Sequence, residues 1–144
     1  MKNEANYFEI FNESLSETGT TIAELENQKV ITKYTFYKFK QYCPSLKNAL
    51  NIANYLKLSL DYILDNVPDN KFKKYKENQS EFFIKLTKIL DSMKITKRKF
   101  CIDLGISDAN FTKWKSGTMP KFSTIINISN YLQCDIDDLL SHEN

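Results

Sequence analysis

The chain has 144 residues, of which 42% are hydrophobic and 26% charged, and its formal net charge is +2. This length allows one ordinary domain or two small ones, and no apolar run approaches the roughly 18 residues that a membrane-spanning helix needs. One histidine, His142, and three scattered glycines exclude imidazole triads, multi-histidine metal sites, P-loops and dinucleotide-binding fingerprints, so we expect no enzyme.

The amino terminus carries charged residues and no long apolar segment, which argues against a secretory signal and predicts a cytoplasmic protein. Cys43, Cys101 and Cys134 are odd in number and show no CxxC spacing. We therefore expect buried, reduced thiols rather than a disulfide framework or a metal site.

Charge alternates along the chain. Residues 1–28 carry a net charge of −5 and residues 29–60 carry +6, whereas residues 94–121 carry +5 and residues 122–144 carry −4. Basic segments confined to particular elements indicate phosphate binding. Two ordinary solvated faces would give the same pattern, so charge alone does not decide the matter.

Residues 66–80 predict a linker. Pro68 and the polar residues after it end the first domain, and the later part of the segment favours a helical lead into the second. A flexible chain of this length spans only about 20 Å. We therefore expect two neighbouring domains, at residues 1–65 and 81–144.

In the second half, apolar residues recur at steps of three and four, which predicts a series of helices. The residues expected to face the core are Phe82, Phe83, Leu86, Ile89, Leu90, Met93, Phe100, Cys101, Leu104, Phe111 and Trp114. The residues expected to begin or end these helices are Thr96, Gly105, Ser107, Gly117, Pro120, Ser123 and Asp135. Because neither half shows the period-two alternation of a sheet, we predict an all-α fold.

The chain contains an internal repeat, found by aligning it with itself. Residues 44–64 match residues 120–140 without a gap, at an offset of 76. Upstream the offset is 75, and the matched pairs include Thr21/Thr96, Leu25/Phe100, Ile31/Ile106, Thr32/Ser107 and Phe36/Phe111. Chance alignment over this length, with apolar positions matched, is improbable. We predict a duplicated domain.

Across residues 82–140 the second repeat resembles the Cro/repressor-type helix-turn-helix family, also called the xenobiotic-response-element family. The resemblance rests on an ordered set of residues: Thr96, Phe100, Cys101, Leu104, Gly105, Ile106, Ser107, Phe111, Trp114, Gly117 and Pro120. It implies two tandem five-helix, lambda-repressor-like helix-turn-helix domains. In such domains the third helix enters the major groove of DNA and the second lies across the backbone.

The first repeat is similar but departs from the family pattern at four positions. Glu26 stands where a small residue is usual, and Lys29 stands where a buried leucine is usual. Val30 takes the place of the turn glycine, and Tyr42 that of the glycine that closes the third helix. These departures put its second helix and turn in doubt and leave open whether the first repeat reads DNA itself.

The resemblance also implies DNA contacts. Asn110 would bind adenine, Lys113 guanine and Asp108 cytosine. The second-repeat residues expected to contact DNA are Thr96, Lys97, Ser107, Asp108, Ala109, Asn110, Lys113, Ser116, Thr118 and Lys121. The corresponding residues of the first repeat are Thr21, Thr32, Lys33, Tyr34, Thr35 and Lys38.

Plainer roles compete with these assignments. Ser107 could serve only as an N-cap, and Asp108 only as a first-turn acid favoured by the helix dipole. Tyr34, Tyr37 and Tyr42 are interleaved with lysines and suit a phosphate-lined groove and a protein interface equally.

We predict a sequence-specific DNA-binding transcriptional regulator, most simply a repressor, whose partner is double-stranded DNA. The alternative is a protein-interaction module, such as an antirepressor or antitoxin-like partner, that offers its Tyr-rich first domain to another protein. Neither function implies a cofactor, a metal, a catalytic residue or a membrane. The sequence leaves a homodimer open.

Overall fold

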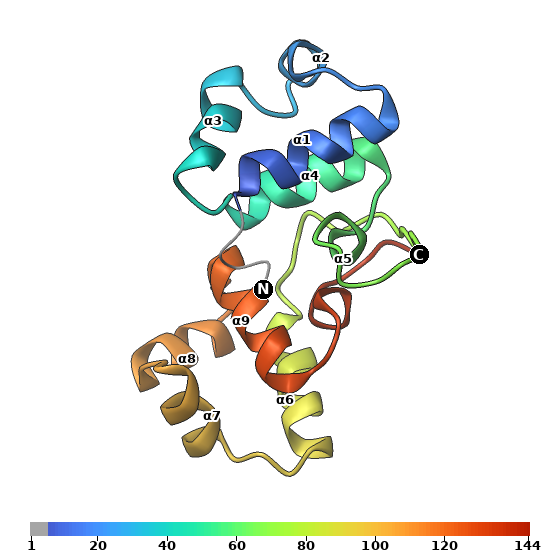
Figure 1. Cartoon of the computed structure of the whole chain (residues 1–144). Coiled ribbons are helices and arrows are strands. Elements are labelled where there is room, and N and C mark those ends of the chain that lie inside the picture. Colours follow the sequence, from blue (N-terminus) through green and yellow to red (C-terminus); the bar gives the residue numbers. More distant parts are fainter. Residues whose placement is uncertain (1–5) are drawn as a thin grey trace.

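The computed structural model describes residues 6–144, and every regular element in that range is helical (Figure 1). The first half consists of α1 (Tyr7–Thr18), α2 (Ile22–Asn27), α3 (Lys33–Tyr37), the 3-10 turn η2 (Lys38–Lys40), α4 (Leu46–Leu56) and α5 (Leu60–Ile63). The second half consists of α6 (Phe82–Ser92), α7 (Lys97–Leu104), α8 (Asp108–Lys115), α9 (Phe122–Leu132) and the 3-10 helix η3 (Ile136–Leu139). The all-α prediction is confirmed for these residues.

Residues 1–5 of the predicted first domain lie outside the described residues. The last element of the second half is a 3-10 helix, capped by Asp135 as expected.

None of the helices within residues 6–144 is long and apolar enough to cross a membrane.

The predicted helix boundaries of α7 and α8 are confirmed. The side chains of Thr96 and Ser107 each accept the backbone N–H three residues further on, at 3.1 Å. Gly105 follows α7 with φ 66°, and Gly117 lies just beyond α8 with φ 107°. A β-carbon is disfavoured in this left-handed region, so glycine suits both turns.

The core of the second half follows the predicted apolar faces, with four corrections. Phe83 and Ile89 of α6 are only partly buried. Phe82, Leu86 and Phe100 are buried as expected. Met93, however, is 45% exposed, because α6 ends at Ser92 and Met93 begins the turn that follows. Leu104 is only partly buried, because it is the last residue of α7, at the edge of the packed region.

The turn between α2 and α3 differs from the sequence alignment. Lys29, not Val30, takes the left-handed conformation, with φ 58°. The Val30 N–H then donates to the Leu25 carbonyl at 2.9 Å. Because the left-handed residue comes one position earlier than Gly105 does in the second half, Lys29 is exposed and does not occupy a buried leucine's place. The turn before Thr32 is one residue longer in compensation.

The end of α3 also differs from its counterpart in the second half. The chain tightens into η2, and the Tyr42 N–H donates to the Lys38 carbonyl at 3.0 Å. Tyr42 has no positive φ. A glycine is therefore not required where Gly117 serves in the second half.

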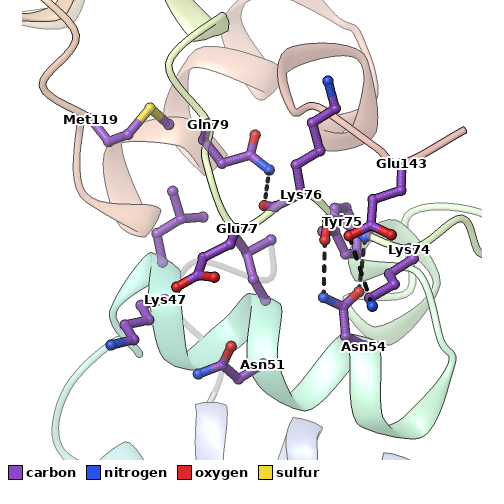
Figure 2. A pocket seen from close by; sticks show the side chains of 12 residues that line it. Lys47, Asn51, Asn54, Lys74, Tyr75, Lys76, Glu77, Gln79, Met119 and Glu143 are labelled. Atoms are coloured by element: carbon purple, nitrogen blue, oxygen red, sulfur yellow. Dashed lines mark hydrogen bonds and ion pairs between the residues drawn. The ribbon is translucent and has the colours of Figure 1, made fainter.

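The prediction of a helical lead within residues 66–80 is wrong. Residues 74–79, the linker segment, form no helix, and their backbone pairs instead with neighbouring elements (Figure 2). The Tyr75 N–H donates to Asn54 Oδ1 at 2.8 Å, and Asn54 Nδ2 donates back to the Tyr75 carbonyl at 3.2 Å. The Lys76 N–H donates to the Ser141 carbonyl at 2.9 Å. The linker is thus fixed on both sides rather than flexible.

A hollow of about 630 Å³ lies where the two halves meet (Figure 2). Its walls are α4, the linker segment and the loop that holds Met119. Its polar rim includes Lys47, Asn51, Lys76 and Glu77. Beneath this surface the buried apolar side chains of both halves form one continuous core.

Candidate nucleic-acid interface

α8 is held by its apolar face and presents a polar one. Phe111 and Trp114 are each 6% exposed. The Phe111 ring lies 5.2 Å from Phe83 and the Trp114 ring 5.8 Å from Phe82, centroid to centroid, so α6 supports α8. The predicted base-facing residues are all exposed: Ser107, Asp108, Ala109, Asn110 and Lys113.

The N-terminal ends of α7 and α8 lie next to each other. An open hollow between them is lined by Lys97, Arg98, Ile102, Ser107 and Asp108, among others. Thr96 and Lys97, predicted to contact phosphate, are exposed at the start of α7. The structure therefore brings the predicted phosphate contacts of α7 beside the predicted base contacts of α8.

Lys97 and Asp108 interact directly. Lys97 Nζ lies 3.7 Å from Asp108 Oδ1 and 5.3 Å from the centre of the Phe111 ring. Exposed ion pairs contribute only about 0–1 kcal/mol. Lys97 can therefore exchange this contact for a phosphate, and Asp108 can exchange it for a base. The ion pair must open before either side chain does so.

A second charged cluster braces α7 against α9. The Tyr131 hydroxyl donates to Asp103 Oδ2, and Lys99 Nζ lies 3.0 Å from the same oxygen. These contacts, the hydroxyl first, hold the pKa of Asp103 below its usual range, and Asp103 in turn raises the pKa of Lys99. The ammonium of Lys99 is thus already paired with Asp103 and is less available to a phosphate than the guanidinium of its neighbour Arg98.

Arg98 was not among the predicted contacts. It is exposed and lines the hollow between α7 and α8. The signal was present in the sequence, because Arg98 lies within the basic run that includes Lys97. Guanidinium groups bind phosphate in a fork geometry that lysine lacks.

Ser116, Thr118 and Lys121 lie at the opposite end of α8 from Asn110. All three are exposed, and Lys121 occupies the N-cap position of α9. Its side chain makes no capping hydrogen bond, so the first N–H groups of α9 have no side-chain cap. This end of the interface is suited to a phosphate rather than to a base.

The first half places its predicted contacts similarly but with a different charge at the helix start. Thr21 and Thr32 cap α2 and α3, and Tyr34 is 72% exposed. Glu26 Oε2, however, accepts the Lys33 N–H at 3.0 Å. The N-terminus of α3 thus already holds a carboxylate, which opposes a second anion there.

Among the remaining predicted contacts of the first half, Lys33 is exposed and Lys38 lies over an aromatic ring. Thr35 and Lys38 are half-buried, and Lys38 Nζ lies 5.1 Å from the centre of the Tyr34 ring. Tyr42 is 64% exposed and Tyr37 47% exposed. The first half therefore presents a basic and aromatic face around α3.

A capped helix, a turn at a left-handed glycine and a second capped helix with an exposed polar face define a helix-turn-helix unit at α7 and α8. Residues 85–144 match the family model of the Cro/C1-type HTH DNA-binding domain. The second half of the chain therefore contains a domain of this type, which indicates a DNA-binding regulator. No curated protein and no solved structure matches the chain.

Proposed function

We propose that this protein is a sequence-specific transcriptional regulator that acts as a repressor by inserting α8 into the major groove of its operator. The observation that carries the proposal is the exposed polar face of α8, held by Phe111 and Trp114, inside the segment matched to the DNA-binding family. Repression requires only that the bound protein occupies a promoter.

Each contact residue of the second half has a role in this proposal. Asn110 and Lys113 read bases, because an amide pairs bidentately with adenine and an ammonium reaches guanine O6 and N7. The phosphate contacts are Thr96, Lys97, Ser116, Thr118 and Lys121, and Ser107, Asp108 and Ala109 complete the groove-facing surface.

We further propose that the chain consists of two tandem helix-turn-helix domains, at residues 1–65 and 81–144, joined by residues 66–80. The similar order of helices in both halves, with η2 as an addition in the first and η3 in the place of α5 in the second, supports this division, as do the threonine caps of α2 and α7. The first domain binds DNA more weakly, because Glu26 occupies the start of α3. Its contacts are Thr21, Thr32, Lys33, Tyr34, Thr35 and Lys38.

Selection of a preferred duplex from random sequences, followed by titration of that duplex and of a scrambled one, tests the function. We expect a preferred site. Affinity for both duplexes should fall with salt, with a log–log slope of about −0.9 for each neutralised phosphate. No enriched sequence, or binding that is indifferent to salt, would contradict the proposal.

A further inference from the structure

The helices that end the two halves pack against each other. α5 and η3 occupy matching positions in the two repeats, at an offset of 76. Leu60 and Ile136, which begin the two helices, and Leu64 and Leu140, which follow them, are all fully buried. The contact therefore joins equivalent elements of the two halves within the shared core.

Asp61 hydrogen-bonds across this interface. Its Oδ1 accepts the Ile136 N–H at 3.0 Å, and its Oδ2 accepts the Asp137 N–H at 2.9 Å. Asp61 is only 2% exposed. Burial raises the pKa of its carboxyl, and the two N–H donors oppose that rise. A side chain of the first half thus caps the last helix of the second half.

The reverse contact is made through a third residue, Tyr75. Asp137, the counterpart of Asp61, accepts a hydrogen bond from the Tyr75 hydroxyl. That hydroxyl accepts the N–H of Leu60, the counterpart of Ile136, at 2.8 Å. Tyr75, which is 1% exposed, thus bridges Leu60 and Asp137, whereas Asp61 accepts the Ile136 N–H directly.

A contact in which residue i meets residue j, and the counterpart of j meets the counterpart of i, is the mark of a two-fold axis. Here the two partners are halves of one chain. α3 and α8 lie on one side of the molecule, at the upper and lower left of Figure 1, and α5 lies on the other side. The interface and the linker segment hold them in that arrangement.

Resting on the proposed function, we propose that a single chain binds a two-part, imperfectly palindromic DNA site without a second copy. A two-fold arrangement of helix-turn-helix units fits half-sites about 34 Å apart, one turn of the duplex. α8 reads the stronger half-site, and α3 contacts the weaker one. The α5 and η3 surfaces are already paired within the chain and are not open to another copy.

The test uses the full chain and the selected duplex, with the mass of the complex and a hydroxyl-radical footprint as readouts. We expect one chain per duplex and two protected half-sites. Inserting 5 base pairs between them should weaken binding about tenfold, because the weaker half-site then faces away. Inserting 10 base pairs moves it a full turn along the duplex and should not restore the affinity.

The matched variants are Lys33→Ala, on α3, and Lys88→Ala, an exposed lysine on α6. Lys33→Ala should reduce protection of the weaker half-site alone, and Lys88→Ala should change nothing. Two chains on each duplex, or a single protected half-site with no effect of spacing, would overturn this inference and leave the proposed function standing. If the unmodified chain shows no sequence preference, the proposed function itself is overturned.

Discussion

At the scale of single residues, the exposed amide of Asn110 and the ammonium of Lys97 differ in what they can recognise. Asn110 is exposed in the first turn of α8, whereas Lys97 lies at the start of α7 beside Asp108. An amide can distinguish bases, but a lysine on a phosphate cannot. Their substitutions should therefore have different signatures.

We expect Asn110→Ala to weaken the selected site by about 1–3 kcal/mol and to relax one base position. Lys97→Ala should weaken selected and scrambled duplexes alike and reduce the salt slope by about 1. Asn127→Ala, at an exposed position on α9, is the control. Gel-shift titrations on both duplexes measure these effects. Equal losses from both variants on both duplexes would refute the orientation assigned to α8.

The three cysteines provide a second residue-level prediction. All three thiols are free in the structure, and Cys101 is the most buried of them. Burial, the largest cause, and the neighbouring Asp138 and Asp135 raise the pKa of Cys134 to about 11. At pH 8 about one Cys134 thiol in a thousand is then ionised, against about a quarter for an ordinary cysteine.

We therefore expect iodoacetamide to label Cys134 slowly at pH 8 and faster as the pH rises toward 11, because the thiolate is the reacting form. Peptide mass spectrometry on the folded protein, with the urea-unfolded chain as control, measures the rate. Labelling of folded and unfolded chains at the same rate would contradict the raised pKa.

At the scale of elements, the turn between α7 and α8 depends on one backbone conformation. Gly105 has φ 66°, and a β-carbon added there would meet no atom within 4 Å. Any cost of substitution is then backbone strain rather than a clash. Gly105→Ala should lower the free energy of unfolding by about 1–2 kcal/mol, and Gly105→Asn by less, because asparagine tolerates this region. Urea denaturation of both variants measures the difference; equal losses would argue against strain as the cause.

The sequence predicted the elements of the second half better than those of the first, for a physical reason. Glycine and short hydroxyl side chains have strong local preferences, so Thr96, Gly105 and Ser107 marked their boundaries correctly. No local sequence preference indicates that a lysine will adopt the left-handed backbone conformation. The one-residue shift at Lys29 was therefore hidden in an alignment that paired side chains rather than backbone angles.

Contacts between distant residues were equally hidden. The hydrogen bond from Lys33 to Glu26 gives a reason for the acid at a position where a small residue was expected, but it becomes visible only once α2 and α3 are placed. The pairing of the linker with Asn54 and Ser141 removed the helix that composition favoured. The polar contact set of α8, in contrast, was implied by the resemblance to the helix-turn-helix family, and the structure leaves all of it exposed.

At the scale of the whole molecule, the shared core and the capping of η3 by Asp61 couple the two halves. We expect a single unfolding transition in calorimetry, with calorimetric and van't Hoff enthalpies equal. Two separate transitions would show that the halves unfold independently.

Asp61→Asn should lower the stability of both halves together. The amide keeps one acceptor oxygen but turns its N–H₂ group toward a backbone N–H, which costs about 1–3 kcal/mol at a buried site. Asp69→Asn, at an exposed position in the linker, is the matched control and should have no effect. Residue-resolved hydrogen exchange measures the stability of each half. A loss of amide protection confined to one half would contradict the coupling.

The pairing of the linker segment with residues 141–143 also has a consequence for synthesis of the protein. During translation α5 is made long before η3 and these residues. At about 5–20 residues per second, Asp61 waits roughly 4–15 seconds for the backbone that it caps. For that time the nascent first half lacks the partner that covers α5, and two such chains on one polysome could pair with each other. The covalent link between the halves gives the correct partner the advantage, because it is always the nearest.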